Sequence, residues 1–138
     1  MKINYSIVDV FSTGKYTGNQ LAVFKNAGAI SDQEMQQIAK EVNYSETTFI
    51  TSNLKSDGGF DVRIFTPNEE VPFAGHPTLG TAFVIQNEII ERPLETLFLN
   101  FKAGQIQVSF NNQEEVLWMK QNEPTFGQLL DRKIVSDV

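Results

Sequence analysis

Short runs of apolar residues, alternating or continuous, recur along the chain and predict strands. Residues 3–11 alternate, with Ile3, Tyr5 and Ile7 on one face, as in a half-buried strand. A loop containing Gly14 and Gly18 follows, and the apolar run at 21–24 predicts a second strand. Residues 47–51 and 60–66 are two more such runs, and the Asp-Gly-Gly turn between them predicts a hairpin.

Two segments have the pattern of helices. Ser31 and Glu34 form a capping box, and Met35, Ile38, Ala39 and Val42 then make one apolar stripe, so helix 31–42 should pack on a sheet. The segment after His76 begins with a proline suited to a first helical turn and is apolar on most sides. A helix of that composition is expected to be enclosed by the rest of the domain.

Three further runs, at 96–101, 105–110 and 115–120, are separated by short turns and predict an antiparallel meander. Trp118 and Met119 are assigned to its core. These elements together predict an α+β domain in which a strongly curved mixed sheet has one helix outside and one apolar helix inside. Residues 1–120 form that domain, and the more polar residues 121–138 form a linker or tail.

The chain has 138 residues, enough for one hydrophobic core, and carries 17 acidic against 11 basic residues. A net charge of −6 opposes the phosphate contacts that nucleic-acid binding requires. No apolar run is long enough to cross a bilayer, and the N-terminus lacks the apolar core of a signal peptide. We therefore expect a cytoplasmic protein with neither nucleic acid nor membrane as a partner.

The residue types present restrict the chemistry. The sequence has no cysteine, which removes thiol nucleophiles and thiolate metal ligands, and it has a single histidine. The glycines do not follow the strand, glycine turn and helix order of a nucleotide-binding loop. Neither a metal nor a cofactor is expected.

Two polar clusters interrupt the apolar pattern, at 43–46 before a strand and at 69–78 before the enclosed helix. Glu46 enters an apolar strand, where partial desolvation would raise its pKa and suit it to general acid–base catalysis. The alternative, a solvated carboxylate at a strand edge, is favoured by the pattern alone.

Gly75 and His76 precede a helix, so their backbone N–H groups and the helix dipole would favour an anion such as a carboxylate. The His76 side chain could also donate to a carboxylate or to an enolising carbonyl, or could merely cap the helix. Asn19, after Gly18, is an ordinary turn residue by pattern. Arg63 could pair with Glu69, Glu70 or an anionic ligand, and a surface ion pair of little energetic weight is the simplest interpretation.

The segment from Arg63 to Ala82, RIFTPNEEVPFAGHPTLGTA, resembles the signature of the PhzF-like family. Residues 8–24, 45–50 and 116–127 match other parts of that family in the same order. The resemblance implies a diaminopimelate-epimerase-like fold and a cofactor-independent isomerase acting on a small, carboxylate-bearing anionic metabolite. It also implies that Glu46 transfers the proton and that Ser45, Gly75, His76 and Asn19 bind the substrate.

The resemblance also shows where this chain differs. Related racemases use two cysteines, which are missing here, and Gln20 stands where the family commonly has proline. Family members usually have two domains, with the active site between them, so we expect this chain to be the N-terminal half and to form a homodimer or pair with a second domain. A non-catalytic metabolite-binding or protein-interaction module is the alternative.

Overall fold

The structure is a computed structural model and describes residues 2–130. Its strands pair side by side in the order β1-β2-β3-β4-β6-β7-β8, with β5 paired to β4. The strands are β1 (Tyr5–Val10), β2 (Asn19–Phe24), β3 (Thr47–Ile50), β4 (Phe60–Phe65), β5 (Glu70–Val71), β6 (Thr96–Phe101), β7 (Gly104–Asn111) and β8 (Val116–Met119). The helices are α1 (Asp32–Val42) and α2 (Gly75–Val84), and α2 continues as the π-helix η1 (Ile85–Ile90).

The sheet consists of two groups of strands. In the first, β1 and β2 are antiparallel, β2 and β3 are parallel with α1 as the crossover between them, and β3 and β4 form the predicted hairpin. In the second, β6, β7 and β8 form the predicted meander. The two groups meet in a short parallel ladder of two residue pairs between β4 and β6, Phe60 with Leu99 and Asp61 with Asn100.

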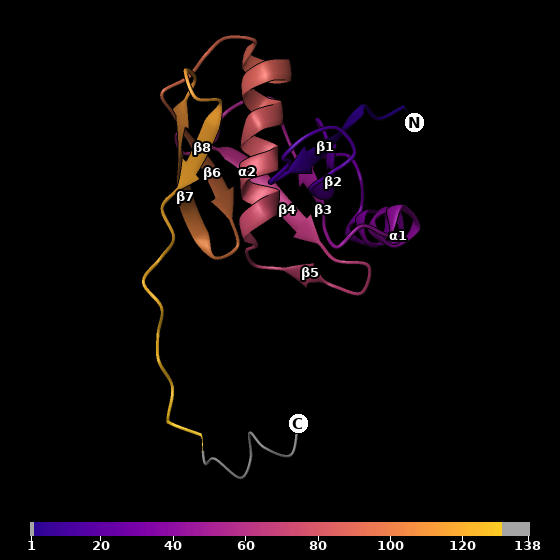
Figure 1. Cartoon of the computed structure of the whole chain (residues 1–138). Helices are drawn as coiled ribbons and strands as arrows, with labels where there is room; N and C mark the ends of the chain where they lie inside the picture. The colour runs from indigo at the N-terminus through magenta and orange to yellow at the C-terminus, as the bar shows by residue number, and fades with distance from the viewer. Residues whose placement is uncertain (1, 131–138) are drawn as a thin grey trace.

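Helix α2 lies between these two groups of strands, and the sheet curves around it (Figure 1). Its Thr81, Ala82 and Val84 are fully buried among the inward-facing residues of strands from both groups. Gly80 permits the close contact with the sheet, because a Cβ atom there would lie 2.6 Å from Leu21 Cδ2 and 2.9 Å from Val10 Cγ2. The predicted α+β class, with an apolar helix inside a curved mixed sheet, is confirmed.

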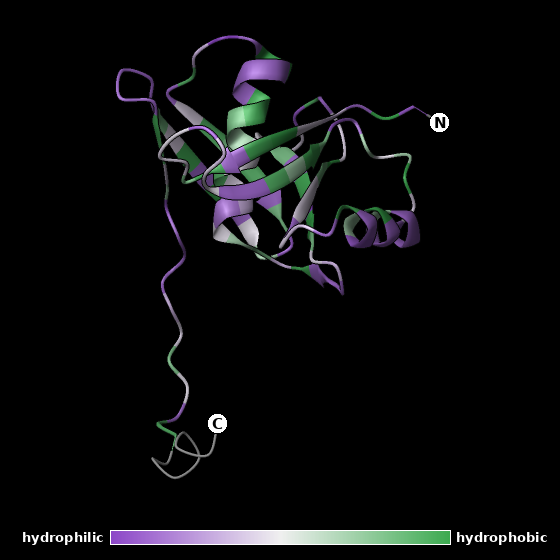
Figure 2. Cartoon of the chain, turned by 45° about the vertical axis from the view of Figure 1, so that its right-hand side comes forward, coloured by the Kyte–Doolittle hydropathy of each residue, from purple (hydrophilic) through white to green (hydrophobic). Residues whose placement is uncertain are grey.

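Helix α1 covers the outer face of the first group of strands (Figure 1). The predicted capping box is present: Ser31 Oγ accepts from the Glu34 backbone N–H, and the Glu34 side chain accepts from the Ser31 N–H. Met35 and Ala39 are buried in a second apolar cluster that includes Phe49. Most of the outward surface of α1 is polar, while the apolar segments gather in the strands and α2 (Figure 2).

Two predictions about side-chain burial are wrong. Tyr5 and Ile7 are more than half exposed, because Val8 and Val10 are the residues of β1 that face α2. Trp118 is 67% exposed. Side chains alternate along a strand, and in β8 Leu117 and Met119 face the core, so Trp118 faces outwards. Met119 was assigned correctly.

The last strand ends at Met119, and the Lys120 N–H still donates to the Gln107 carbonyl at 3.2 Å. Residues 121–130 have no regular secondary structure, are exposed and extend away from the sheet (Figure 1). The rest of the predicted tail, residues 131–138, lies outside the described residues. The division into a domain at 1–120 and a linker at 121–138 stays a prediction.

Replacing Gly80 with valine should separate α2 from β1 and β2. We expect Gly80→Val to lower the free energy of unfolding by about 1–3 kcal/mol, as overpacking of a filled core does. Urea denaturation followed by circular dichroism measures this change. Gly14→Val is the control, because no atom lies within 4 Å of the position its Cβ would take. Equal midpoints for the two variants would contradict the proposed tight packing.

Candidate active site

Three segments meet at one end of the sheet: the start of β2, the start of β3 and the start of α2. Strands β2 and β3 are parallel, with Ala22 opposite Thr47, so both strands begin at the same end of the sheet. The Ser45 hydroxyl donates to Asn19 Oδ1 at 3.1 Å across this edge. The parallel register therefore brings together two predicted site residues that are 26 positions apart in the sequence.

Glu46 is directed to the inner side of the sheet, where α2 begins. Its carboxylate Oε2 lies 3.3 Å from His76 Nδ1, and the two side chains are 20% and 9% exposed. A buried hydrogen bond of 2.9 Å runs from Thr81 of α2, the helix that carries His76, to Thr48 of β3, the strand that follows Glu46. That bond fixes the helix relative to the strand and therefore fixes His76 relative to Glu46.

Polar atoms in this region remain without partners. Among the described residues, Glu46 Oε2, His76 Nε2 and Thr47 Oγ1 are buried and make no hydrogen bond. Buried polar groups are hydrogen-bonded in the great majority of cases, because an unpaired one retains its full desolvation cost. Two of these three atoms belong to Glu46 and His76, so the contact between these two side chains leaves a polar atom of each without a hydrogen bond.

The start of α2 supplies backbone donors. Its N-cap residue, Ala74, has no side chain able to cap the helix, and the first turn contains no acidic residue. The N–H groups of Gly75 and His76 are among those that have no partner within a helix, and Pro77 has no N–H. These donors and the positive end of the helix dipole form a place for an anion. By contrast, α1 uses Ser31 and Glu34 to satisfy its own N-terminus.

Gly75 lies in close contact with β8. A Cβ atom at this position would lie 3.1 Å from Met119 Cε of β8, which is closer than an ordinary van der Waals contact. The second group of strands thus packs directly against the first residue of α2. A larger residue at position 75 would require Met119 or the start of the helix to move.

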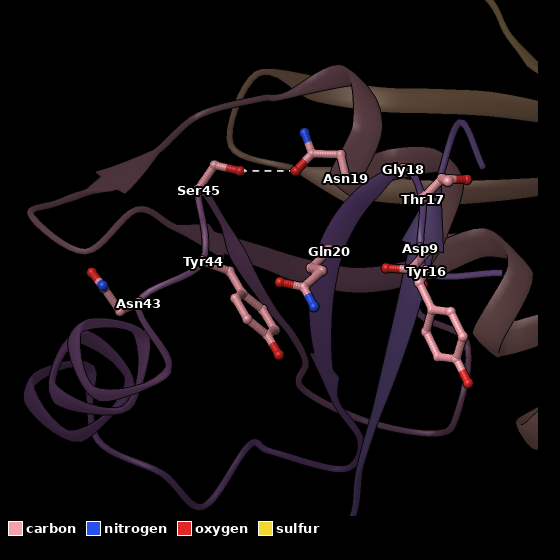
Figure 3. Close-up of a pocket in the computed structure, with 9 residues that line it drawn as sticks. All are labelled: Asp9, Tyr16, Thr17, Gly18, Asn19, Gln20, Asn43, Tyr44 and Ser45. Carbon is pink, nitrogen blue, oxygen red and sulfur yellow. Dashed lines mark hydrogen bonds between the residues drawn. The ribbon is translucent and has the colours of Figure 1, made fainter. Parts of the chain in front are cut away.

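A polar cavity of about 580 Å³ adjoins this edge of the sheet (Figure 3). Asn19 and Ser45 line it, whereas Glu46 and His76 do not. Gln20 enters it from the face of β2 opposite α2, since Leu21 and Val23 face the helix and Gln20 alternates with them. The Asn19–Ser45 bond is therefore on the rim of the cavity, and Ser45 adjoins Glu46 in the sequence.

The structure accordingly places the five predicted site residues in two adjoining groups. Glu46, Gly75 and His76 lie at the start of α2, and Asn19 and Ser45 lie on the rim of the cavity. Sequence reasoning did not select the other polar residues of the cavity, namely Asp9, Tyr16, Thr17, Gln20, Asn43 and Tyr44. For Asn43 and Tyr44 a signal existed, because they belong to the polar cluster at 43–46. Asp9 had only its position on the outward face of a strand.

Arg63 is engaged in an ion network. Its Nε and Nη2 atoms each donate to Glu70 at 2.8 Å, and Nη1 donates to Asp32 at 2.5 Å. Lys102 Nζ donates to Glu70 at 2.5 Å. The Arg63 hydrogen bonds lower the pKa of Glu70 and of Asp32, and in return raise the pKa of Arg63. The Arg63 and Glu70 side chains are only 23% and 14% exposed, so the predicted surface ion pair of little weight is in fact partly buried.

Within residues 2–130, no three His, Cys, Asp or Glu side chains are grouped so that they could hold a metal ion. None of the described helices has the length and apolar character needed to span a membrane.

The curved sheet around a central helix defines a diaminopimelate-epimerase-like fold. The family model described as phenazine biosynthesis-like protein matches residues 8–134, and the chain belongs to this PhzF family. Two solved PhzF-family proteins are similar to it. That of Bacillus anthracis is 27% identical, with a TM-score of 0.74 over 86% of this chain and 40% of that one. That of Enterococcus faecalis is 36% identical, with a TM-score of 0.72 over 81% of this chain and 42% of that one.

Curated relatives are named isomerases. An uncharacterised isomerase of Pasteurella multocida is 41% identical over 135 residues, which are 91% of this chain and 46% of the relative. The trans-2,3-dihydro-3-hydroxyanthranilate isomerase of Pseudomonas aeruginosa is 38% identical over 110 residues, or 80% of this chain and 38% of the relative. The chain thus spans less than half the length of these relatives.

The ion network around Arg63 should make stability depend on acid pH. The pKa of Glu70 is lowered in the folded state, so its contribution is present above its ordinary value of 4.5 and is lost as the pH falls through the lower folded value. We expect Glu70→Gln to reduce the free energy of unfolding at pH 7 by about 1–3 kcal/mol, because hydrogen bonds to a charged group are lost. The reduction should shrink below pH 4.

Urea denaturation between pH 3 and pH 7 measures this effect. Glu41→Gln, on the exposed face of α1, removes one carboxylate without removing an ion pair and serves as the control. Parallel stability curves for wild type and Glu70→Gln over the whole range would contradict the assignment.

Proposed function

We propose that this chain supplies the proton-transfer half of a PhzF-family isomerase and that Glu46 carries the proton. The observation that supports this most strongly is the Glu46–His76 contact of 3.3 Å beside an uncapped helix start. A carboxylate base, an imidazole hydrogen-bond donor and an anion site lie together there, in a position shielded from most solvent. Such a combination suits removal of a proton next to a carboxylate or carbonyl group.

The proposed reaction begins when a substrate carboxylate accepts from the N–H groups of Gly75 and His76. Glu46 then takes a proton from one carbon atom of the substrate and delivers it to another. One proton leaves the substrate and one is delivered to it, and the Glu46 carboxyl group can exchange its proton with solvent between the two steps. The double bonds move and the overall composition does not change. Ser45 and Asn19 hold polar groups of the substrate at the rim.

The identity of the substrate follows only in outline. One relative is named for trans-2,3-dihydro-3-hydroxyanthranilate, an anionic ring compound, and we infer a small carboxylate-bearing metabolite for this chain.

We further propose that residues 1–120 form one half of the catalytic unit and that 121–138 lead towards the other half. The chain covers 38–46% of its relatives, which supports a site completed by a second unit.

Replacing Glu46 with glutamine should abolish proton exchange. Trans-2,3-dihydro-3-hydroxyanthranilate incubated with the protein in D₂O is followed by ¹H NMR, and we expect deuterium incorporation to fall by at least about 100-fold in Glu46→Gln. Glu41→Gln should exchange at the wild-type rate. Exchange that persists in Glu46→Gln would exclude Glu46 as the proton carrier.

The same variants separate an enzyme from a binding module. Ligand titration followed by NMR should show binding weakened in His76→Ala and largely kept in Glu46→Gln. If the wild type binds the ligand and no variant or wild-type sample exchanges a proton, the chain is a metabolite-binding module. If the ligand does not bind, the proposed anion site is wrong.

The mass in solution tests how the site is completed. We expect sedimentation equilibrium to give a species of twice the chain mass of 15.5 kDa, since the chain spans less than half the length of its relatives and a second copy could supply the other half of the site. A stable monomer at all concentrations would contradict the homodimer. The catalytic unit would then require a different second half.

A further inference from the structure

The segment that joins β4 to α2, residues 66–74, determines where the start of α2 lies. It leaves β4 after Phe65, forms a turn and the two-residue strand β5, and then enters the helix at Gly75. The sequence motif at 63–82 includes Arg63 and Glu70 as well as Gly75 and His76, yet the proposed reaction uses only the last two. A role for the first two is therefore open.

This segment is attached to the body of the domain at several points. Gln36 of α1 donates to the Thr66 carbonyl at 2.9 Å, and within the segment the Thr66 N–H closes a turn by donating to the Glu69 carbonyl at 2.8 Å. Further along, the Ala103 N–H donates to the Pro72 carbonyl at 3.1 Å. These contacts lie before and after β5, so β5 is the middle of the segment.

Strand β5 is too short to hold this middle part by backbone pairing. Only Val71 and Glu70 pair with β4, opposite Ile64 and Phe65. Isolated two-stranded pairings of even ordinary length are marginal in water. An additional attachment is needed if the segment is to keep one conformation.

The Arg63 side chain provides that attachment. It binds Glu70 through two parallel N–H donors at 2.8 Å, and the planar guanidinium makes this geometry specific. Its remaining contact, to Asp32, ties the same group to the first turn of α1. With these carboxylates bound, Arg63 is not free to bind a substrate anion.

We propose that Arg63 and Glu70 are positioning residues: they fix the 66–74 segment so that Gly75 and His76 face Glu46. Glu70 is six positions before His76, and the residues between them are confined by the Pro72–Ala103 bond and by Phe73 packed edge-on against Phe101 at 6.0 Å. A displacement at Glu70 is therefore carried into the helix start. The catalytic consequence rests on the proposed function, whereas the positioning itself can be measured without activity.

The experiment compares Glu70→Gln with Glu88→Gln in the full chain. Glu88 is a matched control, because it also pairs with a lysine, Lys25, but lies on η1, away from the segment. Amide hydrogen exchange is followed by NMR at Thr66 and Ala103, whose N–H groups donate to carbonyl groups of the segment. Gly28 and Phe110, whose N–H groups donate to carbonyl groups outside the segment, are the reference amides. His76 is the single histidine, so its imidazole signals report the site without overlap.

In Glu70→Gln we expect exchange at Thr66 and Ala103 to accelerate roughly tenfold more than at Gly28 and Phe110, as local opening would cause. The His76 signals should shift or broaden. In Glu88→Gln the exchange rates of the two pairs of amides should change equally, and the positions and widths of the His76 signals should be unchanged. Uniform acceleration in Glu70→Gln with unchanged His76 signals would overturn the proposal.

Arg63→Lys provides a milder variant if Glu70→Gln does not fold. Lysine keeps the charge but loses the two-pronged geometry, so the same pattern should appear at smaller amplitude. Benzoate titration adds the functional test, and its Kd should rise in both variants and not in Glu88→Gln. If benzoate does not bind the wild type, the anion site of the proposed function fails, while the exchange data still decide whether Arg63 and Glu70 position the segment.

Discussion

The enclosure of α2 by the curved sheet is the contact on which the rest of the molecule depends. The two groups of strands share only two residue pairs between β4 and β6, so the helix between them supplies much of what holds them together. Each valine, leucine, isoleucine or phenylalanine side chain fully buried there contributes about 1.5–3 kcal/mol relative to exposure. Gly80 lets the helix approach β1 and β2 closely, and the Thr81–Thr48 bond prevents it from sliding along β3.

Because α2 is fixed sideways and along its length, its first turn has little freedom. It emerges at the edge where β2 and β3 begin, which places His76 beside Glu46 and leaves buried atoms of both without hydrogen bonds. An isolated loop could not hold such groups, since it would relax until they reached water. The apolar packing along α2 is thus the free-energy source that keeps a poorly satisfied polar pair in place.

Most of the fold could be predicted from local patterns. The capping box fixed the start of α1, and the alternation of Phe60, Val62 and Ile64 gave the buried face of β4. Alternation alone could not say which face of β1 or β8 would be covered, because both strands carry apolar residues on each face. Tyr5 and Trp118 were misplaced for this reason: the choice depends on which face α2 occupies, and that is a tertiary contact.

The site could be predicted only in part, and the reason is distance along the chain. The local pattern offered Glu46 and His76 only as candidates, each beside a simpler interpretation, and the resemblance to a family decided between the two. Their contact arises from a parallel strand register and a helix position that no local pattern specifies. Arg63 shows the same limit: Glu70 was an available partner at seven positions, whereas Asp32 joins Arg63 from 31 positions away and Lys102 joins Glu70 from 32 positions away. A network whose members come from α1, β4, β5 and the loop after β6 has a role that can be argued only once those elements are assembled.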